Sequence, residues 1–200
     1  MAEFTPIARG PIAARSPVLR DGWEVSDVQS DGTLHIADCT PLAKWIVRAA
    51  AQSSAAGVLE TQHGRARRDG GVLVIGSAPG EWTLIGDASA ATLAKRACDA
   101  AAGEFSNSID QTHGRALLRL SGEHTRELLA KVCGIDLDDR ITPDGTAFRS
   151  SVAKLVCDVV REDRDGAPSY WIHCERSSGQ YLFDALVDAG EEFGIEIDRC

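Results

Sequence analysis

The sequence predicts an α+β fold in which two βαββαβ units, the ferredoxin-like order of elements, follow one another in one chain. The leading observation is an internal similarity, because residues 82–110 align without a gap with residues 170–198. Both windows read as strand, helix and strand, and a duplicated half restricts the fold. The identical pairs include Ser89 with Ser177, Ala97 with Ala185, Glu104 with Glu192, Phe105 with Phe193, Ile109 with Ile197 and Asp110 with Asp198.

The first 30 residues differ in character from the rest. They contain scattered prolines and arginines and show no periodic apolar pattern up to residue 20. We expect residues 1–30 to form an extended N-terminal arm, which either lacks order or lies on a partner. Residues 23–25 and 33–36 are short strand-like pieces, and residues 31–198 form the folded domain.

The first repeat spans about residues 33–110. Its strands are apolar or rich in β-branched residues, and its two helices are rich in alanine. The continuous apolar run at 72–75 indicates a central strand, and Gly76–Gly80 reads as a hairpin turn. The predicted strands are 44–48, 72–75, 82–85 and 105–109, and the predicted helices are 49–59 and 89–101.

The second repeat spans about residues 111–198 and has the same order. Ser121 is placed to cap its first helix and Gly134 to end it. A longer insertion, residues 134–151, precedes the next strand. The predicted strands are 115–120, 152–160, 170–174 and 195–197, and the predicted helices are 123–133 and 177–189.

Two Asp-x-Thr segments recur before strands, at Asp38–Thr40 and at Asp110–Thr112. Asp and Thr side chains can bond the backbone near them, so we interpret both segments as structural corners. The alternative interpretation is a ligand site.

Six cysteines occur without a CxxC pair or zinc-finger spacing to a histidine, so we expect reduced, buried or half-buried thiols. They are Cys39, Cys98, Cys133, Cys157, Cys174 and Cys200.

Charge and hydropathy narrow the class of protein. The 200 residues carry a net charge of −9, which disfavours a general nucleic-acid binder, since such proteins need basic surface. No apolar run is long enough to span a bilayer, and the N-terminus lacks a secretion-signal pattern. We expect a cytoplasmic protein that binds neither nucleic acid nor membrane.

Motifs for catalysis are absent from the sequence. There is no GxSxG, no phosphate-binding loop, no GxGxxG and no HExxH. His173 and Cys174 are adjacent on a strand and face opposite sides, so they cannot share a metal. The basic run Arg65–Arg68 reads as an exposed loop or, alternatively, a docking patch for an acidic partner. We predict no catalytic, cofactor-binding or metal-binding residues; the scattered histidines are His35, His63, His113, His124 and His173.

One stretch carries a family resemblance. Residues 115–136, RALLRLSGEHTRELLAKVCGID, resemble the gamma subunit of heterotetrameric sarcosine oxidase, as do Asp38–Leu42, Ala78–Trp82 and the closing residues 170–197. The similarity covers about residues 30–198. That subunit is itself similar to the folate-binding domain of aminomethyltransferases, which implies the same tandem ferredoxin-like fold.

The resemblance implies a non-catalytic structural subunit of a flavin-dependent sarcosine or N-methyl amine oxidase or demethylase. FAD, FMN, NAD and tetrahydrofolate would then reside in the alpha, beta and delta partner subunits. The alternative is a free-standing tetrahydrofolate-binding one-carbon module. The iron–sulfur-associated relatives carry a Lys-Gly-Cys-Tyr-x-Gly-Gln-Glu motif, which this sequence lacks. Complete aminomethyltransferases also need a C-terminal barrel, and we expect none after Cys200.

Overall fold

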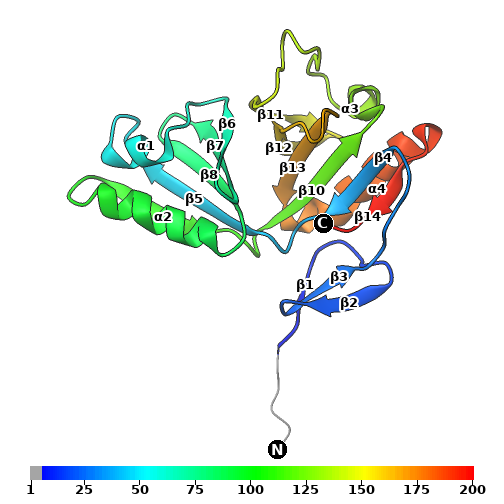
Figure 1. The fold of residues 1–200 in the computed structure, drawn as a ribbon, viewed down its shortest axis with the longest axis horizontal. Helices are drawn as coiled ribbons and strands as arrows, with labels where there is room; N and C mark the ends of the chain where they lie inside the picture. The colour runs from blue at the N-terminus through cyan, green and yellow to red at the C-terminus, as the bar shows by residue number, and fades with distance from the viewer. Residues whose placement is uncertain (1–5) are drawn as a thin grey trace, which may run out of the picture.

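The computed structural model describes residues 6–200, which form three β-sheets and four α-helices (Figure 1). The smallest sheet lies in the N-terminal arm and has the order β1-β3-β2. The arm is therefore not simply extended over its described part; residues 1–5 lie outside the described residues. The strands of this sheet are β1 (Ala8–Arg9), β2 (Pro17–Arg20) and β3 (Trp23–Ser26).

The arm contacts the rest of the chain at specific points. The Trp23 ring stacks on His113 with 4.7 Å between the ring centroids. The Ala13 amide donates to Gln180 Oε1 at 2.7 Å, and Arg176 donates to the Arg9 carbonyl oxygen. These contacts fix the small sheet below the two larger sheets in Figure 1.

The first large sheet has five strands in the order β6-β7-β8-β5-β9. Its strands are β5 (Ala43–Ala49), β6 (Ala66–Asp69), β7 (Val72–Ala78), β8 (Glu81–Gly86) and β9 (Ser106–Asp110). Helices α1 (Ser54–Leu59) and α2 (Ser89–Ala100) connect them and cover one face.

The second large sheet has six strands in the order β11-β12-β13-β10-β4-β14. Its strands are β4 (Leu34–Asp38), β10 (Arg115–Gly122), β11 (Ala147–Val152), β12 (Leu155–Arg161), β13 (Ser169–Glu175) and β14 (Glu196–Asp198). Helices α3 (Thr125–Val132) and α4 (Gly179–Gly190) cover its outer face.

Strand β4 lies in the second large sheet, although the repeat boundaries predict it in the first. It falls within the expected first repeat, residues 33–110, but pairs antiparallel with β10 and parallel with β14. Leu34 and Ile36 accordingly belong to the core beneath α3 and α4. The α+β class is confirmed, but the two sheets do not correspond to two uninterrupted stretches of sequence.

The chain forms four layers, with helices outside and the inner faces of the two large sheets against each other (Figure 1). Successive strand residues point to opposite faces. In β7, Val72 and Val74 therefore pack under helices α1 and α2, while Leu73 and Ile75 pack against the other sheet. Burial on both faces explains why the central strands are continuous apolar runs.

Several predicted boundaries were wrong for local reasons. The helix expected over 49–59 begins only at Ser54, because Ala49 still pairs with Ser106 in the sheet. The basic run Arg65–Arg68 is not a loop, since Ala66–Asp69 form an edge strand paired with β7. Arg68 on that strand donates to Glu162, which lies in the second half of the chain.

Two boundaries in the second half also differ. Ser121 does not cap a helix, because β10 continues through Gly122 and the helix begins at Thr125. Gly122 has φ +108, and a Cβ there would lie 2.0 Å from the Thr33 carbonyl oxygen. The strand expected over 152–160 begins only at Leu155, because Ala153 and Lys154 both have positive φ and form the turn of a hairpin between β11 and β12.

The Asp-x-Thr corners have the predicted structural role. Asp38 Oδ1 accepts from the Thr40 amide at 3.0 Å, and Asp110 Oδ1 accepts from the Thr112 amide at 2.8 Å. The corners also bond reciprocally. The Thr40 hydroxyl accepts from the Leu117 amide, and the Thr112 hydroxyl accepts from the Lys44 amide. Each corner therefore holds the first residues of the strand that follows the other corner.

Replacing Thr40 by valine is expected to lower the free energy of unfolding by about 1–3 kcal/mol, because the buried Leu117 amide would lose its acceptor. Urea unfolding of Thr40→Val measures this loss. Thr33→Val, at an exposed threonine, should change stability by less than about 0.5 kcal/mol. Equal stabilities for the two variants would contradict the role of the corner.

The expectation of six reduced thiols is wrong for two of them. Cys39 and Cys200 form a disulfide with a Cα–Cα distance of 5.2 Å, across a sequence separation of 161 residues. Connectivity over such a distance cannot be read from spacing. The other four cysteines are free, and Cys133, Cys157 and Cys174 are buried as expected.

Within residues 6–200, no helix combines the length and the apolar character that crossing a bilayer requires.

Candidate functional site

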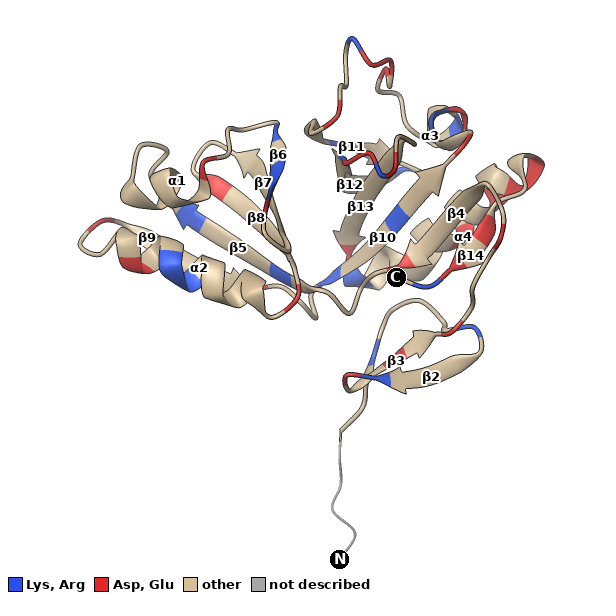
Figure 2. Ribbon diagram, in the orientation of Figure 1, with Lys and Arg blue, Asp and Glu red and all other residues tan. Residues whose placement is uncertain are grey.

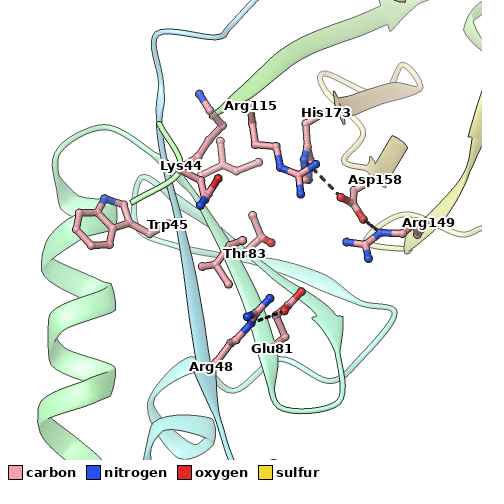
Figure 3. A pocket seen from close by; sticks show the side chains of 12 residues that line it. Lys44, Trp45, Arg48, Glu81, Thr83, Arg115, Arg149, Asp158 and His173 are labelled. Atoms are coloured by element: carbon pink, nitrogen blue, oxygen red, sulfur yellow. Dashed lines mark hydrogen bonds and ion pairs between the residues drawn. The ribbon is translucent and has the colours of Figure 1, made fainter. Parts of the chain in front are cut away.

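A polar cavity of about 150 Å³ lies between the inner faces of the two large sheets (Figure 3). Strands β5 and β8 form one wall, and strands β10 to β13 contribute the other. Figure 2 shows basic positions along β5 and β10, the strands that meet beside this cavity. The lining side chains are Lys44, Trp45, Ile46, Arg48, Glu81, Thr83, Ile85, Gln111, Arg115, Arg149, Asp158 and His173.

His173 is a deeply buried ionisable group of the cavity. It is 5% exposed, and neither ring nitrogen has a hydrogen-bond partner. Its Nδ1 lies 3.6 Å from Asp158 Oδ2 on the neighbouring strand. Burial lowers the pKa of His173 to about 4, and outweighs the attraction of Asp158, which acts to raise it. His173 is therefore neutral at pH 7.

Two ion pairs stand at the entrance. Arg149 Nε donates to Asp158 Oδ1 at 2.6 Å, and Arg48 Nε donates to Glu81 Oε2 at 2.8 Å. The two arginine side chains are about half exposed, whereas the carboxylates lie further inside. Figure 3 shows the two pairs on opposite walls of the cavity.

Two further cations contact the cavity. Arg115 lines it beside His173 and pairs with Glu175 at 3.0 Å. Lys44 is almost fully buried and donates to the carbonyl oxygens of Thr40 and Leu42 at 2.6 and 2.8 Å. Burial lowers the pKa of Lys44 to about 8, although Asp38 and Asp110 act to raise it.

The structure separates the other residues that the sequence analysis considered. His35 contacts Ser30, His113 stacks on Trp23, and His124 stacks on Phe193. His173 and Cys174 face opposite sides of β13, as predicted, because Cys174 belongs to the core under α4. Among residues 6–200, no three His, Cys, Asp or Glu side chains are grouped to hold a metal ion.

Sequence reasoning treated His173 as an ordinary lone histidine and missed the cavity. A signal was present in the internal alignment, which places His173 opposite Ile85 of the first half. Ile85 packs in the core between the sheets, so the matched position in the second half carries a polar ring at an inner-face site. A polar residue at a position whose repeat equivalent is apolar is an observable sequence feature.

Acid is expected to destabilise the protein through His173. The unfolded histidine has a pKa near 6.5 and the folded one about 4, so the unfolded state binds the extra proton between these values. The contribution of His173 is fully present above pH 6.5 and is lost as the pH falls towards 4. It amounts to about 3 kcal/mol, measurable by urea unfolding across this pH range.

His173→Gln should flatten the pH dependence of stability between pH 4 and 6.5. The matched control is His63→Gln, because His63 is exposed. An unchanged acid dependence in His173→Gln would show that other groups cause it. Ring nitrogen NMR of the parent protein at pH 5.5 should find His173 neutral.

A second, more apolar pocket of about 540 Å³ lies between the N-terminal sheet and the body. Trp23 and Val25 of β3 form one side, and the Cys39–Cys200 disulfide forms part of the other. Because this pocket separates them, the N-terminal sheet contacts the rest of the chain over only part of the face that it turns towards it.

Together these features define an α+β protein with two facing sheets, outer helices and a polar cavity between the sheets. A model of the sarcosine oxidase, gamma subunit family matches residues 50–192. The match covers most of the chain, and the protein belongs to this family. No protein with a curated description matches the sequence.

Solved structures share the mixed α+β fold of this chain. The chain is similar to a chain of heterotetrameric sarcosine oxidase from Corynebacterium sp. U-96 in complex with pyrrole 2-carboxylate, with 20% identity and a TM-score of 0.70, over 82% of this chain and 88% of that chain. It is also similar to glycine cleavage system aminomethyltransferase T from Bartonella henselae, with 14% identity and a TM-score of 0.69. There the match spans 96% of this chain but only 59% of the other.

Proposed function

We propose that the protein is a small, non-catalytic structural subunit of a heteromeric flavin-dependent sarcosine or N-methyl amine oxidase. The observation that carries this proposal is the match to the sarcosine oxidase gamma subunit family over residues 50–192. The similarity to a chain of a heterotetrameric sarcosine oxidase supports it through the fold. The role of such a chain is to hold larger subunits together.

In this proposal the chain carries no catalytic, cofactor-binding or metal-binding residues for the oxidation itself. FAD, FMN, NAD and tetrahydrofolate belong to the alpha, beta and delta subunits, and the complex is cytoplasmic. The net charge of −9 agrees with a chain that contacts proteins rather than nucleic acid.

We also infer that residues 31–198 form one domain that arose from two ferredoxin-like units. In the first sheet, strands β9-β5-β8-β7 follow the order in which the fourth, first, third and second strands of such a unit lie. The second sheet has β14, β10, β13 and β12 in the corresponding order, with β4 inserted between β14 and β10. The reciprocal bonds of the two Asp-x-Thr corners support the same inference.

The N-terminal arm is the proposed contact surface for a partner. Its small sheet projects from the body in Figure 1, and Leu19 on this sheet and Ile7 directly before it are exposed apolar residues. Ile141, in the insertion before β11, is exposed as well. Exposed apolar residues on a projecting segment are typical of subunit interfaces.

Purification of the tagged chain from its native cells under mild conditions tests the proposal. We expect larger subunits in fixed stoichiometry and the absorption spectrum of bound flavin. A colourless monomer without partners would contradict the proposal.

Two matched variants locate the contact. Leu19→Asp introduces a charge on the arm, and Val156→Asp introduces the same charge at an exposed apolar position of β12. If the arm is the contact surface, Leu19→Asp reduces the recovery of partner subunits and Val156→Asp does not. Equal recovery with both variants would exclude the arm.

The alternative function is a free-standing tetrahydrofolate-binding module, favoured by the coverage of 96% of this chain in the aminomethyltransferase comparison. The cavity between the sheets does not fit that ligand. Its volume is about 150 Å³, below the roughly 300 Å³ at which pockets for ligands of drug size begin. Thermal stabilisation of the isolated monomer by tetrahydrofolate would nevertheless favour the alternative.

A further inference from the structure

The cavity between the sheets contains a polar ring in a place where the surrounding core is apolar. His173 is only 5% exposed, and neither of its ring nitrogens has a hydrogen-bond partner. Leaving a buried polar group unpaired costs about 1–3 kcal/mol. Such an orphaned group in a cavity indicates a missing partner. A neutral imidazole supplies one N–H donor and one nitrogen acceptor to that partner.

The charges around the cavity favour an anion as this partner. Four cationic side chains line it, against two carboxylates that already pair with cations at the entrance. Arg115 has a further partner, Glu175, outside the lining. Lys44 is balanced by Asp38 and Asp110, which act on it from outside the lining, and Arg48 and Arg149 are balanced by the two lining carboxylates. Glu175 is 68% exposed, so Arg115 is the lining cation whose counter-charge faces solvent. The four cations are Lys44, Arg48, Arg115 and Arg149.

The size of the cavity limits the ligand. A cavity of about 150 Å³ in another protein accommodates benzene, which has six heavy atoms. The planar fork of an arginine guanidinium matches a carboxylate, which can accept two parallel hydrogen bonds. Lys44 is already bonded to two backbone carbonyl oxygens, so Arg115 is the cation next to His173 that is left to receive the ligand.

We propose that the cavity between the two sheets binds a small carboxylate monoanion, which accepts hydrogen bonds from Arg115 and His173. The ligand enters between the Arg48–Glu81 and Arg149–Asp158 pairs. The site is independent of the proposed role in subunit assembly, because none of its inner groups lies on the arm.

Binding is measured on the full-length chain by NMR of the histidine ring nitrogens at pH 7 and constant ionic strength. The probe is acetate, and the matched ligand is acetamide, which has nearly the same shape without charge. The His173 resonances are assigned by their loss in His173→Gln. Acetate should shift them saturably, whereas acetamide should leave them unchanged.

Variants test which side chain holds the anion. Arg115→Gln should weaken acetate binding about tenfold or more, since a charge-assisted hydrogen bond contributes about 1.5–3 kcal/mol. Arg96→Gln removes the same charge from an exposed position of α2 and should leave binding unchanged. Calorimetric titration of the parent and of Arg115→Gln with acetate gives the same comparison without an assignment, so it stays informative even if substitutions at His173 disturb folding.

Three outcomes would overturn the proposal. One is a His173 resonance that does not shift when acetate is added up to a roughly 100-fold excess over the protein. Such an excess reaches roughly the millimolar range in which weak ligands bind. Another is an equal response to acetamide, which would show that charge plays no part. The third is a saturable response to inorganic phosphate without any response to acetate. This result would show that the cavity binds a different class of anion from the carboxylate proposed.

Discussion

Replacing Trp171 by alanine is expected to lower the free energy of unfolding by about 3–5 kcal/mol. Trp171 is buried between the two large sheets, in the core that both inner faces share. Its Nε1 donates to Glu162 Oε2 at 2.7 Å, and the Arg119 guanidinium lies 4.5 Å from the ring centroid. Glu162 in turn accepts from Arg68 on strand β6 of the first sheet.

The alanine substitution would therefore remove packing volume and a polar link between the sheets together. Guanidinium chloride unfolding of Trp171→Ala measures the loss. The control is Tyr181→Ala, which truncates an exposed aromatic residue on α4 and should cost less than about 1 kcal/mol. A loss at Trp171 no larger than that at Tyr181 would mean that the sheets are held together elsewhere.

Breaking the Cys39–Cys200 disulfide is expected to cost about 2–5 kcal/mol. The bridge closes a loop with a sequence separation of 161 residues, and the chain-entropy model assigns about 5 kcal/mol to a loop of this length. Cys200 is exposed, so Cys200→Ser removes the bridge without emptying the core. Urea unfolding of the oxidised parent and of the variant compares them.

Cys98→Ser, at a free half-buried thiol, is the control and should keep the parent stability. A reducing agent should destabilise the parent by the same amount as Cys200→Ser and leave that variant unaffected. Titration of the denatured, unreduced parent should find four thiols. A count of six thiols would contradict the disulfide. A reducing compartment would also break the disulfide, so the titration is made on unreduced protein.

The sequence predicted the fold class and most elements, because strands buried on both faces leave strong apolar runs. Residues 72–75, 82–85 and 170–174 lie within β7, β8 and β13. The predicted boundaries were wrong where the local pattern fits both a strand and a helix. In the alanine-rich segment after residue 48, for example, Ala49 still belongs to strand β5. The hairpin at Ala153 and Lys154 lacks the glycine or asparagine that normally marks such a turn.

The cavity and the disulfide escaped prediction because both depend on pairing across the whole chain. His173 approaches Arg115 only once β13 pairs with β10, and Lys44 only once the two sheets face each other. Cys39 meets Cys200 only once β14 pairs with β4. Neither arrangement has a local pattern, although the alignment of His173 with Ile85 pointed to one unusual position.

The insertion of β4 between β10 and β14 has a consequence for synthesis. The ribosome makes β4 early, but its neighbours in the sheet emerge only at residues 115–122 and 196–198. During translation the backbone N–H and C=O groups of β4 therefore lack their partners in β10 and β14 until those strands are synthesised. Such distant pairing slows folding and exposes strand edges. A nascent chain arrested before residue 115 should be protease-sensitive at residues 34–38, and a chain that includes residues 196–198 should be protected there.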